Sequence, residues 1–235
     1  MIRQSGPRHP LVLAALLALV ALWAAPADPA APASPAEPAD FTIARLRYRG
    51  GGDWYGDPTS LPNLLREAEK ALAVATPDEE ARIAIMDDAL FAHPFIYMTG
   101  HGVVDLSDEE ASRLRLYLTS GGFLWADDCY GMDASFRKAL RKVFPEEELV
   151  ELPFGHEIYH IAYEFPQGLP KVHEHDGGPP HGYGIVHEGR LVVFYSFNTD
   201  IGDGLEDPDV HGDPVNIRDA AMKMATNIVA YALTH

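Results

Sequence analysis

The stretch FIYMTGHGVVDLSDEEASRLRLYLTSGGFLWADD, residues 95–128, decides the fold class of this protein. It begins with an apolar run at 95–99 and ends with a second one at 123–126. Neither run alternates apolar with polar residues, which is typical of strands buried on both faces. Between the runs, Ser107 and Glu110 form a capping box that predicts the start of an amphipathic helix. The stretch therefore predicts two parallel strands joined by a helix.

Strand and helix patterns continue to alternate along the chain. Further strands are predicted at 41–48, 82–86, 183–186 and 190–197, and further helices at 61–75, 134–144 and 217–233. This order predicts an α/β fold with a mostly parallel sheet and helices on both faces. Ligands of such sheets bind beyond the carboxyl ends of the strands, here near 50–56, 100–102 and 127–131.

The N-terminus has the layout of a secretory signal. Residues 1–27 combine a short basic start, an apolar run of about 15 residues and an Ala-Pro-Ala cleavage site. The run is shorter than the roughly 20 residues that span a bilayer, so we predict no membrane span in the mature chain. An uncleaved N-terminal anchor stays open. Residues 28–39 form a Pro/Ala-rich linker, which leaves 40–235 as a single exported domain, periplasmic or secreted.

Charge and cysteine content restrict the possible partners. The chain has 18 Lys and Arg against 35 Asp and Glu, a formal net charge of −17. Such a surface repels phosphate backbones, so we expect no nucleic-acid partner. Cys129 is the only cysteine, so no intrachain disulfide can form and a free thiol remains.

Several segments together resemble one protein family. They are LRYRGGGDWY (46–55), PFIYMTGHG (94–102), GGFLWADD (121–128), HEIYH (156–160), and RLVVFYS (190–196) with Asn198 and Gly202 after it. The chain from Phe41 onward resembles the domain-of-unknown-function family 4159. The resemblance implies a flavodoxin-like fold, similar to class I glutamine amidotransferases and trehalose-utilisation (ThuA-like) proteins. It implies no reaction. Some relatives resemble exported or membrane-tethered envelope proteins, in agreement with the signal.

The segment around Cys129 is one candidate for chemistry. A strand, the turn 127–131 and a helix are the setting of a nucleophile elbow, which exposes a thiol beside backbone N–H groups. The amidotransferase elbow reads G-x-C-x-G, and Cys129 with Gly131 matches its second half. Asp127 replaces the first glycine, and the adjacent Asp128 would raise the pKa of the thiol. A small, partly buried residue at a turn is the alternative.

The segment His156-Glu-Ile-Tyr-His160 matches the H-E-x-x-H motif of zinc peptidases. The motif works on a helix, where both imidazoles point at one metal ion. Proline, aromatic and β-branched residues around it disfavour a helix here. In an extended segment the two imidazoles would be about 13 Å apart, so we do not expect a peptidase site.

We expect polar side chains to share the carboxyl edge of the sheet. The ligand-binding candidates are Trp54, His101, Asp127 and His156, and the catalytic candidates are Cys129, His160 and Asp128. The favoured interpretation is an exported domain that binds a small-molecule ligand or an envelope protein partner. The alternative is a hydrolase or amidotransferase-like enzyme that uses Cys129 or the His/Asp cluster, with or without metal.

The sequence favours no resident metal or cofactor. A buried carboxylate pair at 127–128 needs a positive neighbour, and we expect a histidine or arginine rather than stoichiometric zinc. The histidine-rich segment 173–181 also contains glycine and proline, so it is expected to be a surface loop. Residues 200–213 have the composition of a calcium loop but lack its ligand spacing.

Overall fold

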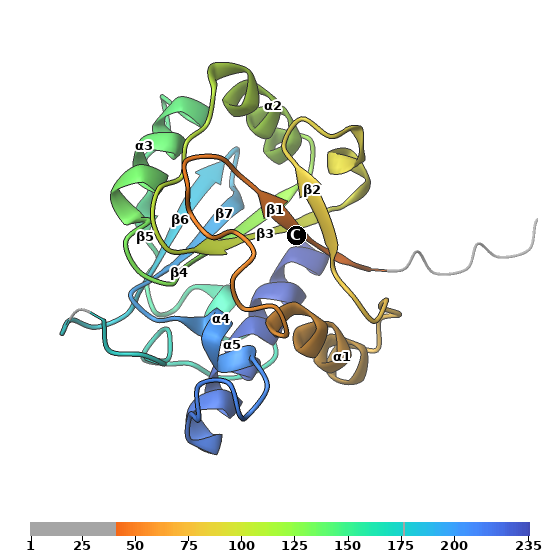
Figure 1. Cartoon of the computed structure of the whole chain (residues 1–235), viewed down its shortest axis with the longest axis vertical. Coiled ribbons are helices and arrows are strands. Elements are labelled where there is room, and N and C mark those ends of the chain that lie inside the picture. The colour runs from red at the N-terminus through yellow and green to blue at the C-terminus, as the bar shows by residue number, and fades with distance from the viewer. Residues whose placement is uncertain (1–40, 176) are drawn as a thin grey trace, which may run out of the picture. The chain divides into compact units, whose positions relative to one another are not determined.

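A mixed sheet crosses the domain in the computed structural model, which describes residues 41–175 and 177–235 (Figure 1). The predicted signal peptide and linker lie outside the described residues. The described strands are β1 (Ile43–Arg47), β2 (Ala81–Ala84), β3 (Phe95–Gly100), β4 (Phe123–Asp128), β5 (Val150–Glu151), β6 (His181–His187) and β7 (Arg190–Phe197). Their order in the seven-stranded sheet is β2-β1-β3-β4-β7-β6-β5. The strands from β2 to β7 in this order are parallel, and β6 and β5 are added by antiparallel pairing. The predicted α/β fold with a mostly parallel sheet is confirmed.

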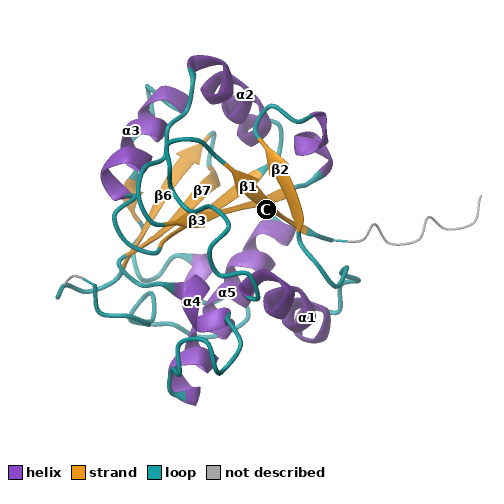
Figure 2. Cartoon of the chain, in the orientation of Figure 1, coloured by secondary structure: helices purple, strands orange, loops and turns teal. Residues whose placement is uncertain are grey.

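Helices cover both faces of the sheet, as predicted (Figure 2). They are α1 (Ser60–Leu72), α2 (Asp108–Thr119), α3 (Asp133–Val143), α4 (Ile201–Leu205) and α5 (Val215–Thr234), with short 3-10 helices at Asp88–Ala92 and Glu157–Tyr159. α2 and α3 pack on one face, and α1, α4 and α5 pack on the other. Within the part of the chain that the structure describes, no helix has the length and apolar character needed to cross a membrane.

The β3-α2-β4 unit forms as its sequence predicts. The Ser107 side chain accepts a hydrogen bond from the Glu110 backbone N–H at 3.1 Å, and the Glu110 carboxylate accepts one from the Ser107 N–H at 2.7 Å. This reciprocal cap fixes the start of α2. Beyond the helix, Gly121 adopts a φ of 110°, a left-handed conformation that favours glycine.

Alternate residues of β4 fill the two cores. Leu124 and Ala126 face α2 and α3, whereas Phe123 and Trp125 face the helices on the other side. Trp125 is fully buried, and its indole N–H donates to the Ser196 hydroxyl of β7 at 2.8 Å. This packing holds β3, β4 and β7 in a register that brings their carboxyl ends level.

Candidate functional site

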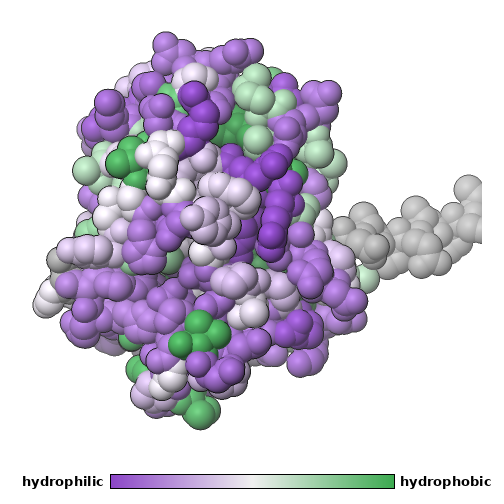
Figure 3. Space-filling view, viewed as in Figure 1, coloured by the Kyte–Doolittle hydropathy of each residue, from purple (hydrophilic) through white to green (hydrophobic). Residues whose placement is uncertain are grey.

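Polar side chains gather where the parallel strands end. β4 ends in Asp127 and Asp128, and these residues lie beside Thr99 and Gly100 in the register with β3. Asp200 follows the end of β7 and directly precedes α4. The face of the molecule seen in Figure 3 is largely hydrophilic, with apolar side chains only in separate patches. The expected gathering of acids at this edge is therefore present.

Five aspartates at or beside this edge are buried, namely Asp57, Asp127, Asp128, Asp200 and Asp203. Asp127 and Asp200 are fully inaccessible, and Asp57, from the loop after β1, is 8% exposed. Burial raises the pKa of Asp127 to about 7. Burial, with the negative charges of neighbouring aspartates, raises the pKa of Asp200 to about 10 and also raises that of Asp57. Such a group of carboxylates favours bound protons or a bound cation.

Gly202 of α4 lies in the middle of these acids. Its backbone N–H donates to Asp127 Oδ2 at 2.6 Å, and the Ser196 hydroxyl donates to the other oxygen of the same carboxylate. A Cβ at Gly202 would lie 2.6 Å from the Tyr97 hydroxyl oxygen and 2.7 Å from Asp57 Oδ2. Only glycine allows α4 to approach the sheet edge this closely.

The Cys129 thiol is buried beneath the surface of this edge of the sheet. The side chain is 1% exposed, with Sγ 2.9 Å from Thr99 Oγ1 and 3.4 Å from Asp57 Oδ2. Burial, followed by the charges of Asp57 and Asp127, raises the pKa of the thiol well above its usual value. A thiol without access to solvent that resists ionisation is a poor nucleophile, so the geometry disfavours the Cys129 mechanism.

The turn after β4 presents a different side chain. Tyr130 has a φ of 130°, a strained conformation for a non-glycine residue, and its ring is 49% exposed. A nucleophile elbow uses such a strained residue to expose its reactive group. Here that position presents a tyrosine ring, which can contact a ligand.

We expect Cys129 to resist alkylation in the folded protein. Because the thiol is buried and its pKa is raised, iodoacetamide at about pH 8 should modify it only as fast as the domain opens. Mass spectrometry of timed samples measures the reaction, and urea-unfolded protein is the control that should react rapidly. Rapid labelling of the folded protein would contradict this geometry.

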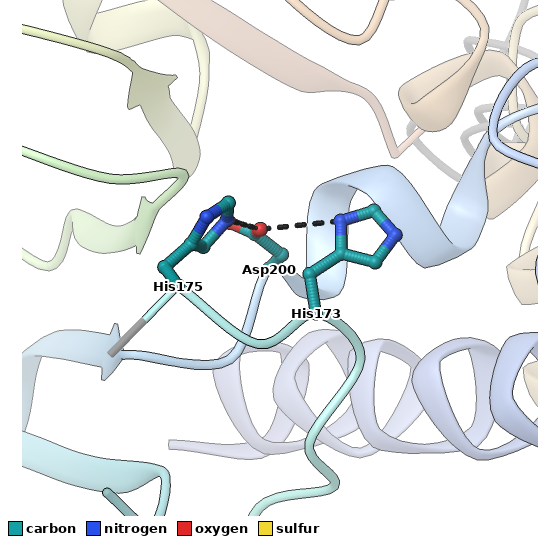
Figure 4. Close-up of side chains that lie close together, drawn as sticks. All are labelled: His173, His175 and Asp200. Atoms are coloured by element: carbon teal, nitrogen blue, oxygen red, sulfur yellow. Dashed lines mark hydrogen bonds and ion pairs between the residues drawn. The ribbon is translucent and has the colours of Figure 1, made fainter. Parts of the chain in front are cut away.

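Two imidazoles of one segment, His173 and His175, meet at Asp200 of a segment farther along the chain (Figure 4). His173 Nδ1 lies 3.3 Å from Asp200 Oδ2, and His175 Nε2 contacts the same oxygen. His173 Nδ1 is also 2.9 Å from Asp203 Oδ2. His211 Nε2 is 3.7 Å from Asp203 Oδ1. These groups have the ligand chemistry of a metal site.

A cavity of about 350 Å³ opens beside this cluster. Its lining residues are Asp128, Tyr130, Gly131, Asp133, Ala134, His175, Phe197 and Asn198. The rings of Tyr130 and His175 pack with their centroids 5.0 Å apart, so this pair connects the cavity to the histidine cluster. The cavity combines two aromatic faces with several carboxylate and amide groups, as small-molecule sites do.

His101 and Trp54 lie at the same edge of the sheet. His101 follows Gly100, which is in register with Asp128, and its Nδ1 is 3.1 Å from Asp53 Oδ2. Trp54 packs its ring edge-on against Tyr55, with centroids 5.6 Å apart, and is partly buried against the core. His101 therefore follows the strand position beside Asp128, but its side chain binds Asp53, and Trp54 packs against Tyr55 and the core.

The structure does not bring His156 and His160 to this edge. The His156 ring lies 5.6 Å from that of Tyr231 in α5, which in turn contacts Phe123 at the opposite end of β4 from Asp128. His160 interacts with Glu164 and with a backbone carbonyl of its own segment. Their segment is a short 3-10 helix on the face covered by α5, so the two imidazoles do not converge on one point.

Residues 42–233 match the family model described as "Domain of unknown function (DUF4159)". The chain belongs to this family. No protein of curated function matches the chain. Membership confirms the resemblance seen in the sequence segments and, like that resemblance, assigns no reaction.

Sequence reasoning did not assign a site to the histidine cluster. The segments 173–181 and 200–213 each contain metal-ligand side chains but have no recognised ligand spacing. They meet only because the β6-β7 hairpin returns the chain to the same edge of the sheet. The available signal was the density of His and Asp in two glycine-containing segments at the ends of one predicted hairpin.

Proposed function

We propose that this protein is an exported ligand-binding domain whose ligand enters the cavity beside Asp128. The observation that carries the proposal is the cavity itself, which lies at the carboxyl edge of a parallel sheet. Export rests on the signal-like layout of residues 1–27. An envelope protein that docks at this edge is the alternative partner.

The chemistry of the lining favours a neutral or cationic ligand. Asp128 and Asp133 offer carboxylate oxygens that accept hydrogen bonds from hydroxyl or ammonium groups. Tyr130 and Phe197 offer ring faces that can pack on a sugar ring or an alkyl-ammonium chain. The net charge of −17 disfavours phosphorylated anions. A polyhydroxylated or polyamine ligand fits best.

Backbone strain at this edge supports a binding role. Tyr130, Asn198 and Asp200 all have positive φ angles, of 130°, 57° and 58°. Strained non-glycine residues cluster where a site must hold side chains in one geometry. Two of these residues, Tyr130 and Asn198, line the cavity.

Replacing Tyr130 by alanine is expected to weaken ligand binding by about 2–10-fold, the worth of one aromatic contact. Isothermal titration calorimetry of the full chain would use trehalose, spermidine and inorganic phosphate as neutral, cationic and anionic probes. Trehalose or spermidine should bind and phosphate should not. Tyr55→Ala is the matched control, since Tyr55 is 63% exposed in another loop and should leave affinity unchanged. Phosphate binding alone, or equal affinity in both variants, would refute the proposal.

The enzyme alternative keeps its His/Asp form, with or without metal. The buried thiol disfavours the cysteine mechanism, and the His160 imidazole is not among the residues of the cavity. The amidotransferase-like and ThuA-like fold classes remain predictions from the resemblance. The mostly parallel sheet with helices on both faces is compatible with them.

A further inference from the structure

We propose that His173, His175 and Asp200 bind a divalent transition-metal ion. One ligand atom from each of these residues lies within 4.8 Å of the others. Figure 4 shows the two imidazoles approaching the Asp200 carboxylate from opposite sides. The proposal goes beyond ligand binding in the cavity, although His175 borders both sites.

One oxygen of the Asp200 carboxylate has no hydrogen-bond donor among the described residues. Asp200 is fully buried, and in the described part of the chain its Oδ1 makes no hydrogen bond. An ionised, buried carboxylate with an unsatisfied oxygen is costly unless a cation or further donors complete it. A metal ion between the carboxylate and the imidazoles would supply the missing interaction.

Asp213 orients His173 as an outer-shell carboxylate orients a metal ligand. His173 Nε2 lies 3.1 Å from Asp213 Oδ1, so this nitrogen donates its proton to the carboxylate. In the neutral imidazole, Nδ1 then carries a lone pair. That lone pair would face the oxygens of Asp200 and Asp203 at 3.3 and 2.9 Å. A metal ion between the lone pair and the carboxylate oxygens would replace their repulsion by coordination. Histidines that bind metal commonly donate their other ring N–H to a carboxylate, as His173 does to Asp213.

The donor set selects the class of metal. Imidazole nitrogen with carboxylate oxygen suits Zn²⁺ and related transition ions, whereas Ca²⁺ and Mg²⁺ prefer oxygen ligands alone. His173 also belongs to a second group, with Asp203 and His211, whose ligand atoms lie within 4.8 Å of one another. The two groups share His173, so Asp203 and His211 lie next to the proposed site. The alternative without metal is direct hydrogen bonding between His173 and the surrounding carboxylates.

Elemental analysis of the full chain, purified without chelator, should find about one transition-metal ion per chain. After the metal is removed, added Co²⁺ should give d–d absorption much stronger than that of the aqueous ion, as low-symmetry coordination by protein ligands produces. His175→Gln should lower zinc affinity by more than about 100-fold, and Asp213→Asn by about 10–100-fold, measured by competition with a chromophoric chelator. His175 is partly exposed, so its variant should fold, which circular dichroism verifies.

His181→Gln is the matched control. His181 is an imidazole of similar exposure that pairs with Glu151 on β5. It should retain wild-type affinity for zinc. If metal content, the cobalt spectrum or zinc affinity is the same in His175→Gln and His181→Gln, the proposed site is refuted. A protein that holds no metal as purified and gives no cobalt spectrum also refutes the site, and His173 is then held by direct hydrogen bonds to the carboxylates. These measurements do not depend on trehalose or spermidine, so the two proposals can fail separately.

Discussion

Arg45→Ala is expected to lower the free energy of unfolding by about 3–5 kcal/mol, the cost of breaking a buried ion pair from one side. Arg45 is fully buried in β1, and its Nε lies 3.2 Å from Glu80 Oε1. Its other nitrogens donate to the carbonyls of Gly56 and Asp57 at 2.7 and 3.0 Å. Among the residues that the structure describes, alanine would leave the half-exposed Arg82 as the one charged partner of the buried Glu80 carboxylate.

The same change should disturb the candidate site. The two carbonyls that Arg45 holds belong to the loop that places the Asp57 side chain among the buried acids. Chemical denaturation followed by tryptophan fluorescence measures the loss of stability. The matched control is Arg47→Ala on the same strand, since the Arg47 and Asp87 side chains are 46% and 42% exposed. Arg47→Ala should lower the free energy of unfolding by less than about 1 kcal/mol. Equal decreases in the free energy of unfolding in the two variants would show that the buried contacts of Arg45 do not stabilise the domain more than an exposed ion pair.

Asp127→Asn is expected to remove one carboxyl group's share of the pH dependence of stability between about pH 4 and pH 7, since Asp57 and Asp200 also have raised pKa values. The pKa of Asp127 is about 7 in the folded domain, against an ordinary value of 3.8. The folded state therefore holds the proton more tightly, and the wild type loses stability as pH rises through this range. At about 1.4 kcal/mol per pH unit, this one group contributes a loss of up to about 4 kcal/mol.

The asparagine should fit the same hydrogen bonds. Its carbonyl can accept from the Gly202 N–H, and its amide can donate to the Ser196 oxygen. Urea denaturation of metal-free protein at several pH values measures the effect. Relative to wild type, the variant should be less stable or equal near pH 4 and more stable near pH 7. A difference between the two proteins that does not change with pH would show that Asp127 is not protonated on folding.

The strands and helices were largely predictable because each follows from a short-range pattern. Continuous apolar runs predicted β3 and β4, and the capping box predicted α2 at its observed start. α4 was missed, because five residues with two glycines carry no helical period. Its position depends on Gly202 fitting between the Tyr97 hydroxyl and the buried acids, which is a tertiary contact. The gathering of acids at the end of β4 was predictable from the rule for parallel sheets.

By itself, the sequence determined the family, the α/β class and the edge of the sheet where polar groups gather. Only the tertiary structure decided which of those groups meet. It buried Cys129, separated His156 and His160 from the edge, and brought His173 and His175 to Asp200. The physical reason is chain distance: these imidazoles are 25 or more residues from their carboxylate partner. No local period or spacing encodes such a contact, because the return of the β6-β7 hairpin and the packing of α4 create it.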